Sequence, residues 1–400
     1  MIQKATTLSR NADSTPSNRQ KVLHLINGEH FSGAERVQDL LAMALPQFGF
    51  EADFACLKPG KFPKVRQSQS ELFEINMKSG YDILCYKKIA KIAKENGYVA
   101  LHAHTPRTLM IGALVARSTK LPLIYHVHSP VSRDSTRWFQ NKINTWVESL
   151  SLRMVEKMIC VSGSLGQYMI ELGNDQHKIN VVNNGVPAIE ELPERNEPGE
   201  CWTIGTMALF RPRKGTEVLL DALAILKEEG LNVKLRAVGP FETPEYEAEI
   251  MAQVERLDIG DRIEWTGFQT DVNHQLQQMD LFVLPSLFGE GLPMVVLEAM
   301  AQAVPVVASR VEGIPEAVRD EVDGLIFEPG DALSLASKII SIYGNNFRWK
   351  SMSDSSVKRQ REKLSDISMA QGVAQVYREV CRMPNCVQEL NITTEEAVCN

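Results

Sequence analysis

Residues 280–303 read DLFVLPSLFGEGLPMVVLEAMAQA. The first letters form an apolar run that is typical of a buried strand, Gly289 and Gly291 mark a loop, and Pro293 suits the first turn of a helix. The pattern therefore predicts a strand, a glycine loop and a helix. Free N–H groups and the positive end of the helix dipole at such a helix start favour a phosphate or another anion.

Two carboxylates flank this predicted anion site. Glu298 is the only charged side chain from residue 291 to residue 309, so on this apolar helix it needs partners to offset its desolvation. Glu290 lies at the mouth of the site, and Glu298 follows about two turns later, where it can accept hydrogen bonds from ligand hydroxyls. This arrangement suggests a sugar nucleotide. The alternative is a packing helix, with Glu290 solvated and Glu298 satisfied by a neighbouring backbone group or an arginine.

The Glu-x7-Glu spacing and its flanks resemble the donor-site signature of the family-4 retaining glycosyltransferases. The sequence VEGIPE at 311–316 is similar to the family's GGIPE turn, with Glu312 where a glycine is usual, and DGL at 323–325 resembles the strand entry that follows. The resemblance implies an α/β protein of GT-B architecture, in which two Rossmann-like doubly wound domains face each other across a cleft. It also implies that Glu298 holds ribose hydroxyls and that Glu290 orients the sugar.

Length and composition agree with two soluble domains. A chain of 400 residues is too long for one ordinary core, and 44% hydrophobic with 23% charged residues is typical of a globular protein. No apolar run is long enough to suggest a membrane span. A net charge of −7 argues against a general nucleic-acid binder. Seven scattered cysteines without a C-x-x-C pair indicate reduced thiols and a cytoplasmic protein, and give no zinc motif.

The domain boundaries follow from composition and from the alternation of predicted strands and helices. The sequence PAIEELPERNEPGE at 187–200 is rich in Pro and Glu with little to bury, which is typical of a linker. We expect a disordered tail at 1–20, an N-terminal acceptor domain at 21–186, the linker at 187–200, a C-terminal nucleotide-sugar donor domain at 201–365, a C-terminal helix crossing back to the N-terminal domain at 366–382, and a tail at 383–400.

The first predicted strand, 21–26, leads into a loop that ends in Ser32 and Gly33, and a helix follows. No G-x-G-x-x-G is present, so a dinucleotide site is not favoured. By the family resemblance, Ser32 and Gly33 lie over the cleft near the donor phosphate and the acceptor. On the sequence alone, Gly33 is equally well explained as a turn glycine.

Four histidines fall at the ends of two predicted strands, as the pairs His102/His104 and His126/His128. Strand alternation places each pair on one face, and the C-terminal ends of strands are where doubly wound sheets bind ligands. Zinc is a competing idea, but no Cys or acidic ligand accompanies the histidines at a suitable spacing. The resemblance of residues 127–130 to the family's T-x-H loop implies that His128 contacts the transferred sugar. His104 and Arg107 are candidates on the acceptor side.

The sequence LFRPRKG at 209–215 follows a predicted strand and precedes a helix. Three cations within four residues favour an anionic partner such as a diphosphate, whereas the alternative is a solvated turn. The family usually has G-R-L-x-x-x-K-G here, so Lys214 matches, but Leu209 occupies the usual arginine position. We take Arg211 as the substitute.

The remaining donor contacts are inferred from the resemblance. Gly239 ends a predicted strand that resembles the family's V-G-x-G-P strand end. Phe268 and Gln269 lie in a loop resembling its base-binding loop, where backbone groups meet the nucleobase. The backbone around Gly291, Leu292 and Pro293 completes this set.

Two segments raise the question of a peripheral contact with the inner membrane. Residues 58–66 form a basic loop with one aromatic, and residues 133–147 carry Trp and Phe at helical spacing beside basic residues. The alternatives are a solvated connection for the first segment and core packing for the second.

The sequence thus predicts a retaining glycosyltransferase that moves a sugar from a nucleoside-diphosphate sugar to a hydroxyl of a saccharide or lipid-linked acceptor, in polysaccharide, lipopolysaccharide or glycolipid assembly. Glu290, His128, Arg211 and Lys214 are the predicted catalytic residues. No D-x-D occurs, so we expect no metal and no cofactor beyond the donor. The alternatives are a same-fold epimerase or phosphorylase, and a catalytically silent sugar-nucleotide binding module.

Overall fold

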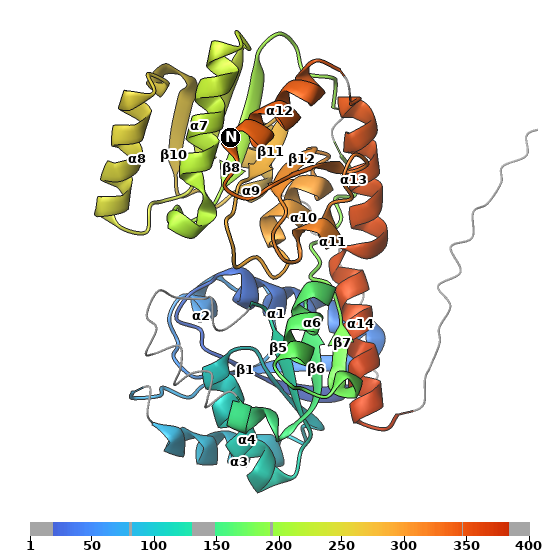
Figure 1. Cartoon of the computed structure of the whole chain (residues 1–400). Helices are drawn as coiled ribbons and strands as arrows, with labels where there is room; N and C mark the ends of the chain where they lie inside the picture. The colour runs from blue at the N-terminus through green and yellow to red at the C-terminus, as the bar shows by residue number, and fades with distance from the viewer. Residues whose placement is uncertain (1–18, 80–81, 130–148, 193–194, 346, 384–400) are drawn as a thin grey trace, which may run out of the picture.

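The computed structural model describes residues 19–79, 82–129, 149–192, 195–345 and 347–383. Its strands form two separate sheets, one in each half of the chain, and every strand pair within a sheet is parallel. Figure 1 shows the two α/β units one above the other. The predicted fold class, α/β with two doubly wound GT-B domains, is confirmed.

The first sheet has the strand order β3-β2-β1-β4-β5-β6-β7. Its strands are β1 (Gln20–Ile26), β2 (Phe50–Cys56), β3 (Leu72–Glu74), β4 (Ala100–Ala103), β5 (Leu123–Val127), β6 (Val155–Cys160) and β7 (Ile179–Val181). The helices of this unit are α1 (Gly33–Ala44), α2 (Phe62–Val65), α3 (Tyr86–Glu95), α4 (Pro106–Thr119) and α6 (Gly163–Glu171). The strands β1, β2, β4 and β5 are largely buried on both faces, which explains their apolar runs, whereas the edge strands β3 and β7 are partly exposed.

The second sheet has the order β10-β9-β8-β11-β12-β13. Its strands are β8 (Trp202–Met207), β9 (Val233–Val238), β10 (Ile263–Gly267), β11 (Leu281–Leu284), β12 (Val306–Ser309) and β13 (Gly324–Phe327). The helices that follow are α7 (Thr216–Glu228), α8 (Pro244–Arg256), α9 (Val272–Gln277), α10 (Met294–Ala301), α11 (Ile314–Ala317), α12 (Ala332–Tyr343), α13 (Trp349–Lys363) and α14 (Asp366–Val380).

Both sheets reverse their strand order at one point, between β1 and β4 in the first and between β8 and β11 in the second. Open α/β sheets bind ligands outside the carboxyl ends of the strands at such a switch point. The loops after these four strands therefore mark the expected site. They contain most of the residues that the sequence singled out.

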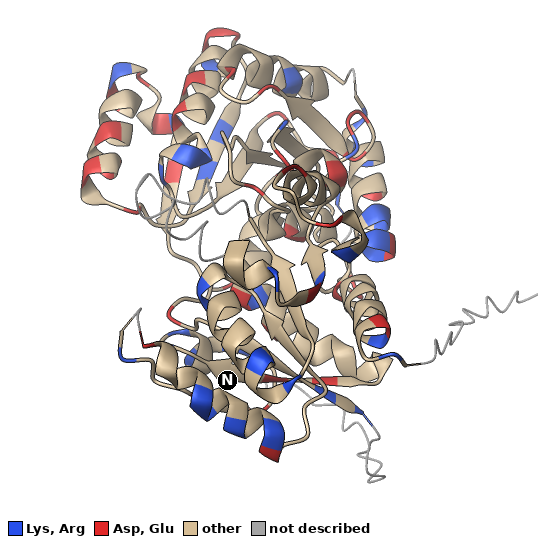
Figure 2. Cartoon of the chain, turned by 60° about the horizontal axis from the view of Figure 1, so that its bottom comes forward, with Lys and Arg blue, Asp and Glu red and all other residues tan. Residues whose placement is uncertain are grey.

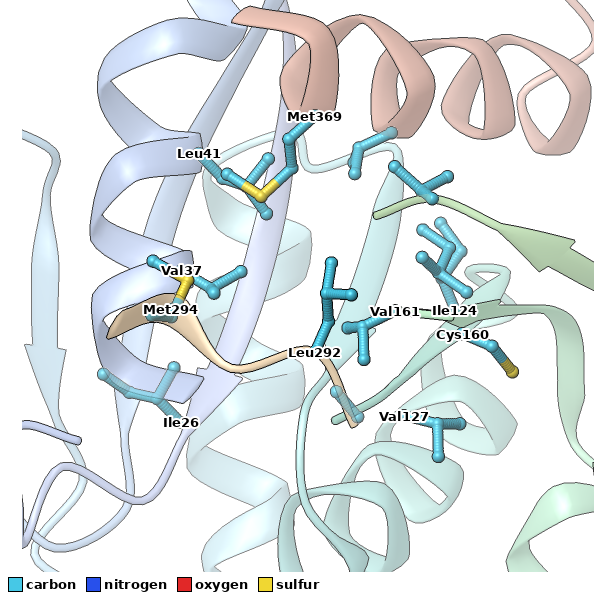
Figure 3. Close-up of a cluster of buried hydrophobic side chains, with 14 of the residues drawn as sticks. Ile26, Val37, Leu41, Ile124, Val127, Cys160, Val161, Leu292, Met294 and Met369 are labelled. Carbon is cyan, nitrogen blue, oxygen red and sulfur yellow. The ribbon is translucent and has the colours of Figure 1, made fainter. Parts of the chain in front are cut away.

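The hydrophobic core of the first domain continues into the start of α10 in the second. Leu292 and Met294 are buried, and they belong to the same cluster as Val37 and Leu41 of α1 and Val161. Figure 3 shows these side chains together, with the loop before α10 crossing between α1 and the end of β6. Because this contact is apolar and buried, it holds the loop between β11 and α10, residues 285–293, against the first domain; we call this loop the donor loop after its predicted role.

The last described helix, α14, packs on the first domain. The helices α13 and α14 run along one side of both domains in Figure 1. In α14, Tyr377 is fully buried and Arg378 donates to the carbonyl of Phe48 at 2.9 Å. Within the described residues, no helix combines the length and apolar character that a bilayer crossing requires.

Candidate active site

Glu290 lies in the loop after β11 and is almost completely buried. Its carboxylate pairs with the ammonium of Lys214 and accepts a hydrogen bond from Ser286 Oγ at 2.7 Å. Burial alone would raise the pKa of this carboxyl, but the nearby Lys214 charge outweighs it and the pKa is lowered. Glu290 is therefore ionised at neutral pH. The structure brings these two predicted catalytic residues together.

The cations of the 209–215 loop point in different directions. Arg213 Nη1 donates to the carbonyl of Gly289 at 2.9 Å and lies 4.0 Å from the Glu290 carboxylate. Arg211 instead pairs with Glu242 at 3.4 Å. The structure thus places Arg213, which the sequence prediction did not select, beside Lys214 and Glu290. The run of three cations was a valid signal, but it could not say which arginine faces the loop after β11.

Glu312, the departure from the family's glycine, caps the donor loop. Its carboxylate accepts hydrogen bonds from the backbone N–H groups of Gly289 at 3.1 Å and Glu290 at 2.7 Å. Its φ of 35° lies in the left-handed region, which explains why glycine is the residue that fits this turn without strain. The charge-assisted hydrogen bonds to the loop offset that strain in this chain.

Gly291 is the point at which the two domains touch backbone to backbone. A Cβ at this position would lie 2.0 Å from the carbonyl oxygen of His128, at the end of β5 in the first domain. Beside it, Leu292 accepts a hydrogen bond from the buried Asn184 Nδ2 at 2.9 Å. The backbone of His128 is therefore next to the donor loop, and the predicted contact of its side chain with the transferred sugar stays a prediction. Asn184 was not singled out, although its Asn-Asn-Gly-Val segment was noted as the exit from the first domain.

Glu298 lies in α10 with its side chain 8% exposed. Its carboxylate forms an ion pair with Arg36, which comes from α1 of the first domain. An arginine partner is what the alternative to ligand binding anticipated, and Arg36 itself was not singled out. The pair involves Glu298 Oε1. The assignment of Glu298 to ribose hydroxyls stays a prediction.

Ser32 and Gly33 lie at the start of α1, close to the start of α10. Ser32 is the N-cap, and its hydroxyl donates to Glu35 Oε2 at 2.5 Å in a capping box. The ideal Cβ position of Gly33 is 4.0 Å from Met294 Cγ. Both residues lie at the interdomain contact, where Ser32 already has a structural role as a helix cap.

The predicted acceptor-side residues lie in different environments. Arg107 pairs with Glu29 at 3.0 Å, and Glu29 also pairs with Lys58 at 3.0 Å. His104 is buried behind His128, and its Nδ1 lies 3.1 Å from His128 Nε2. The structure therefore brings His104 to His128 and connects Arg107 to the loop after β1.

The ring nitrogens of five histidines come close together on one face of the first sheet. Two triplets, His24/His102/His104 and His104/His126/His128, each have ring nitrogens within 4.8 Å of one another. His24 was missed, since a lone histidine in an apolar strand gives no signal. Imidazole nitrogens are zinc ligands, so these are the residues that could hold a metal. No Cys or carboxylate belongs to either triplet.

The residues predicted to lie around the nucleobase are found just after the ends of β9 and β10. Gly239 has a φ of 132°, and a Cβ there would lie 1.8 Å from the carbonyl oxygen of Ala208 at the end of β8. This close approach explains the glycine. Phe268 is 73% exposed just after β10. The Gln269 side chain donates to the carbonyl of Thr266 at 2.8 Å, so it braces its own loop.

Comparison with known proteins shows the family to which the chain belongs. Residues 31–188 match the model described as Glycosyltransferase Family 4, and residues 200–345 match the model described as Glycosyl transferases group 1. The UDP-Gal:alpha-D-GlcNAc-diphosphoundecaprenol alpha-1,3-galactosyltransferase of Escherichia coli is 23% identical over 87% of this chain and 96% of its own length. The lipopolysaccharide 1,6-galactosyltransferase of Escherichia coli K12 is 32% identical over 43% of this chain and 48% of its own.

Solved structures show the same fold. The Anabaena protein Alr3699/HepE, in complex with UDP and glucose, superposes with a TM-score of 0.78 at 22% identity and covers 90% of this chain and 100% of its own. The two family matches together span both domains that build the site. The chain therefore belongs to the GT-B glycosyltransferases of family 4, with a group 1 glycosyltransferase domain as its second half.

Proposed function

We propose that this glycosyltransferase moves a hexosyl group from a UDP-sugar, with retention of configuration, to a hydroxyl of a saccharide or lipid-linked acceptor in polysaccharide, lipopolysaccharide or glycolipid assembly. The observation that carries the proposal is that the Lys214–Glu290 pair, in the loops after β8 and β11 where the second sheet reverses its strand order, lies next to Gly291, which meets the backbone of His128 after β5 of the first domain. The choice of UDP is supported by the name of the Escherichia coli galactosyltransferase and by the UDP bound to the Anabaena protein.

The chemistry follows from where charge develops. The bond between the sugar C1 and the diphosphate oxygen breaks, and its electron pair stays on that oxygen. The acceptor oxygen forms the new bond to C1 on the same face, and its proton leaves with the diphosphate. Lys214, with Arg213 beside it, supplies positive charge where negative charge grows, which is the main electrostatic need of this transition state.

We propose that these cations and the helix dipole serve in place of a metal bridge, and that no cofactor beyond the donor is used. The absence of a D-x-D sequence supports this. Activity should then persist in excess EDTA. Restoration by added Mg²⁺ or Mn²⁺ after loss in EDTA would contradict this part of the proposal.

The experiment for the proposed function measures release of UDP from UDP-galactose, UDP-glucose and UDP-N-acetylglucosamine by the purified protein, with and without saccharide acceptors. We expect release from at least one donor, and its loss in Glu290→Gln, because the partner of Lys214 is neutralised. Binding of UDP without turnover would instead indicate a silent binding module. Exchange of the sugar's C2 hydrogen with solvent would indicate an epimerase.

We also propose that the first domain contacts an anionic membrane surface through α3. Of the two segments the sequence suggested, residues 133–147 lie outside the described residues, and Phe62 of the first segment is fully buried against Phe54. The helix α3 offers a better surface. It exposes Lys87, Lys88, Lys91 and Lys94, and the turn before it exposes Ile83 and Leu84. Figure 2 shows basic residues along the helices at this end of the first domain.

Each lysine near an anionic surface contributes about 1 kcal/mol at moderate salt, so three of them determine roughly two decades of affinity. The affinity for phosphatidylglycerol vesicles, measured by co-sedimentation, should therefore fall about a hundredfold when Lys87, Lys91 and Lys94 are changed together to glutamine. The matched control changes Lys350, Lys358 and Lys363 of α13 in the same way and should retain binding. Equal binding of both triple variants would refute a role for α3.

A further inference from the structure

Five histidines and one tyrosine form a connected polar cluster inside the first domain. The histidines come from the carboxyl-terminal halves of β1, β4 and β5 and from the positions just after β4 and β5, and Tyr377 comes from α14 near the end of the described chain. The register pairs His24 with His102 across β1 and β4. All except His128 are at most 3% exposed. So many polar rings are costly in an apolar core unless they hydrogen-bond to one another.

Four of the histidines and Tyr377 do so in sequence. His128 Nε2 lies 3.1 Å from His104 Nδ1, and His104 Nε2 lies 3.1 Å from His24 Nδ1. His24 Nε2 lies 2.9 Å from Tyr377 Oη, which lies 2.6 Å from His102 Nδ1. We call this chain of contacts, from His128 to His102, the imidazole ribbon. It runs from the interdomain contact to the helix that crosses back from the second domain.

The ring geometry supports hydrogen bonding rather than stacking along the ribbon. The centroids of His104 and His128 are 5.4 Å apart with planes at 20°, and those of His24 and His104 are 5.1 Å apart with planes at 29°. With nitrogens at 3.1 Å, such rings meet edge to edge. By contrast, His102 stacks on His104 at 4.2 Å.

Every ring in the ribbon is neutral at pH 7. Burial lowers the pKa of His24 to about 3 and that of His128 to about 4, and it holds the pKa of His102 and His104 well below the ordinary value. A neutral imidazole has one N–H donor and one bare acceptor nitrogen. Each contact between two rings must therefore contain one hydrogen.

This proton count leaves only two arrangements for the three rings that are bonded in series. If His104 carries its hydrogen on Nδ1, it donates to His128 Nε2, and His24 must donate to it from Nδ1. If His104 carries its hydrogen on Nε2, both neighbours must carry theirs on Nε2 as well. His24, His104 and His128 therefore share one tautomer, and Tyr377 contacts the inner end of the series.

We propose that the imidazole ribbon fixes the ring orientation and the tautomer of His128, which makes His104, His24 and Tyr377 positioning residues of the transferase. This role rests on the proposed contact of His128 with the transferred sugar. Tyr377 then influences the tautomer of His128 from about three side chains away. It does so from α14, a helix that follows the second domain in the sequence. Because Tyr377 contacts the ribbon through its hydroxyl, removal of that one oxygen atom in Tyr377→Phe is sufficient to test the proposal.

The direct test is ¹⁵N–¹H correlation NMR of the histidine side chains in the full chain at pH 7. We expect His24, His104 and His128 to show the same tautomer, which requires no variant. Different tautomers among these three rings would overturn the proposal, because at least one of the two ring-to-ring hydrogen bonds could not exist.

The second test compares Tyr377→Phe with Tyr246→Phe, a matched loss of a buried hydroxyl from α8 in the other domain. In Tyr377→Phe we expect changed ¹⁵N shifts for His24 and His128, and a kcat about tenfold lower at unchanged donor KM, the effect of about one hydrogen bond. Tyr246→Phe should change neither. Unchanged His128 shifts in Tyr377→Phe would overturn the role of Tyr377. Absence of transfer by the wild type would instead count against the proposed function and leave the tautomer result standing.

Discussion

The ion pair between Arg36 and Glu298 joins the two domains, and its removal has a calculable cost. Glu298 is 8% exposed and Arg36 is 32% exposed at the side chain. Loss of one partner from a fully buried pair costs about 3–5 kcal/mol, and partial exposure of the arginine reduces this through solvent screening. We expect Arg36→Met to destabilise the protein by about 2 kcal/mol, because the Glu298 charge stays buried without its partner.

The assay is a double-mutant cycle with Arg36→Met, Glu298→Gln and the double variant, followed by thermal unfolding. At about 2–4 °C per kcal/mol for domains of this size, Arg36→Met should lower Tm by roughly 4–8 °C. Once Glu298 is glutamine, the same arginine substitution should cost about 1 kcal/mol less. As a control, Lys350→Met breaks an exposed pair with Asp354 and should change stability by less than about 0.5 kcal/mol. Additivity of the two site variants would refute the coupling.

Three further predictions follow from the site and the core. Gly291→Ala should abolish transfer and lower Tm, because the new Cβ would lie 2.0 Å from the His128 carbonyl oxygen. Gly199→Ala, which has open space around it, is the control. Full activity in Gly291→Ala would contradict the close contact between the domains. Lys214→Met should lower kcat about a hundredfold, measured as UDP release, since it removes the charge beside Glu290; a change in KM alone would contradict this role. Stability should fall as the pH drops below 6.5, because the unfolded chain takes up protons on histidines that stay neutral in the fold: the pKa of His24 is lowered to about 3, that of His128 to about 4, and those of His102, His104 and His126 are well below 6.5. From pH 6.5 to 5.5 the five together lose about 5 kcal/mol of stability, and His126→Asn should reduce the slope by about a fifth. A flat profile would refute the buried neutral histidines.

The fold was predictable because apolar strand runs and amphipathic helices alternate twice with a polar linker between them. The same local pattern located the loop of Glu290 and the helix of Glu298. Lys214 was singled out because cations at a strand-to-helix turn need an anion. These signals depend on a few consecutive residues, so one sequence is sufficient to read them.

The contacts between distant segments could not be predicted in this way. Arg36 meets Glu298 across 262 positions of the chain, and Tyr377 meets His24 across 353. Such pairs depend on how two finished domains pack, and nothing in the local sequence encodes the partner. Which arginine of the 209–215 loop faces the loop after β11 could not be predicted for a related reason, because the direction of each side chain depends on the turn at residues 212–214.

Isothermal titration calorimetry of the full chain with UDP, GDP and ADP, repeated with Glu298→Gln, tests whether this protein binds a UDP-linked donor through Glu298. We expect one site per chain that prefers UDP, and an affinity at least tenfold weaker in the variant, because the variant lacks the carboxylate that we expect to accept the ribose hydroxyls. No heat with any of the three nucleotides, or equal UDP affinity in both proteins, would contradict this expectation.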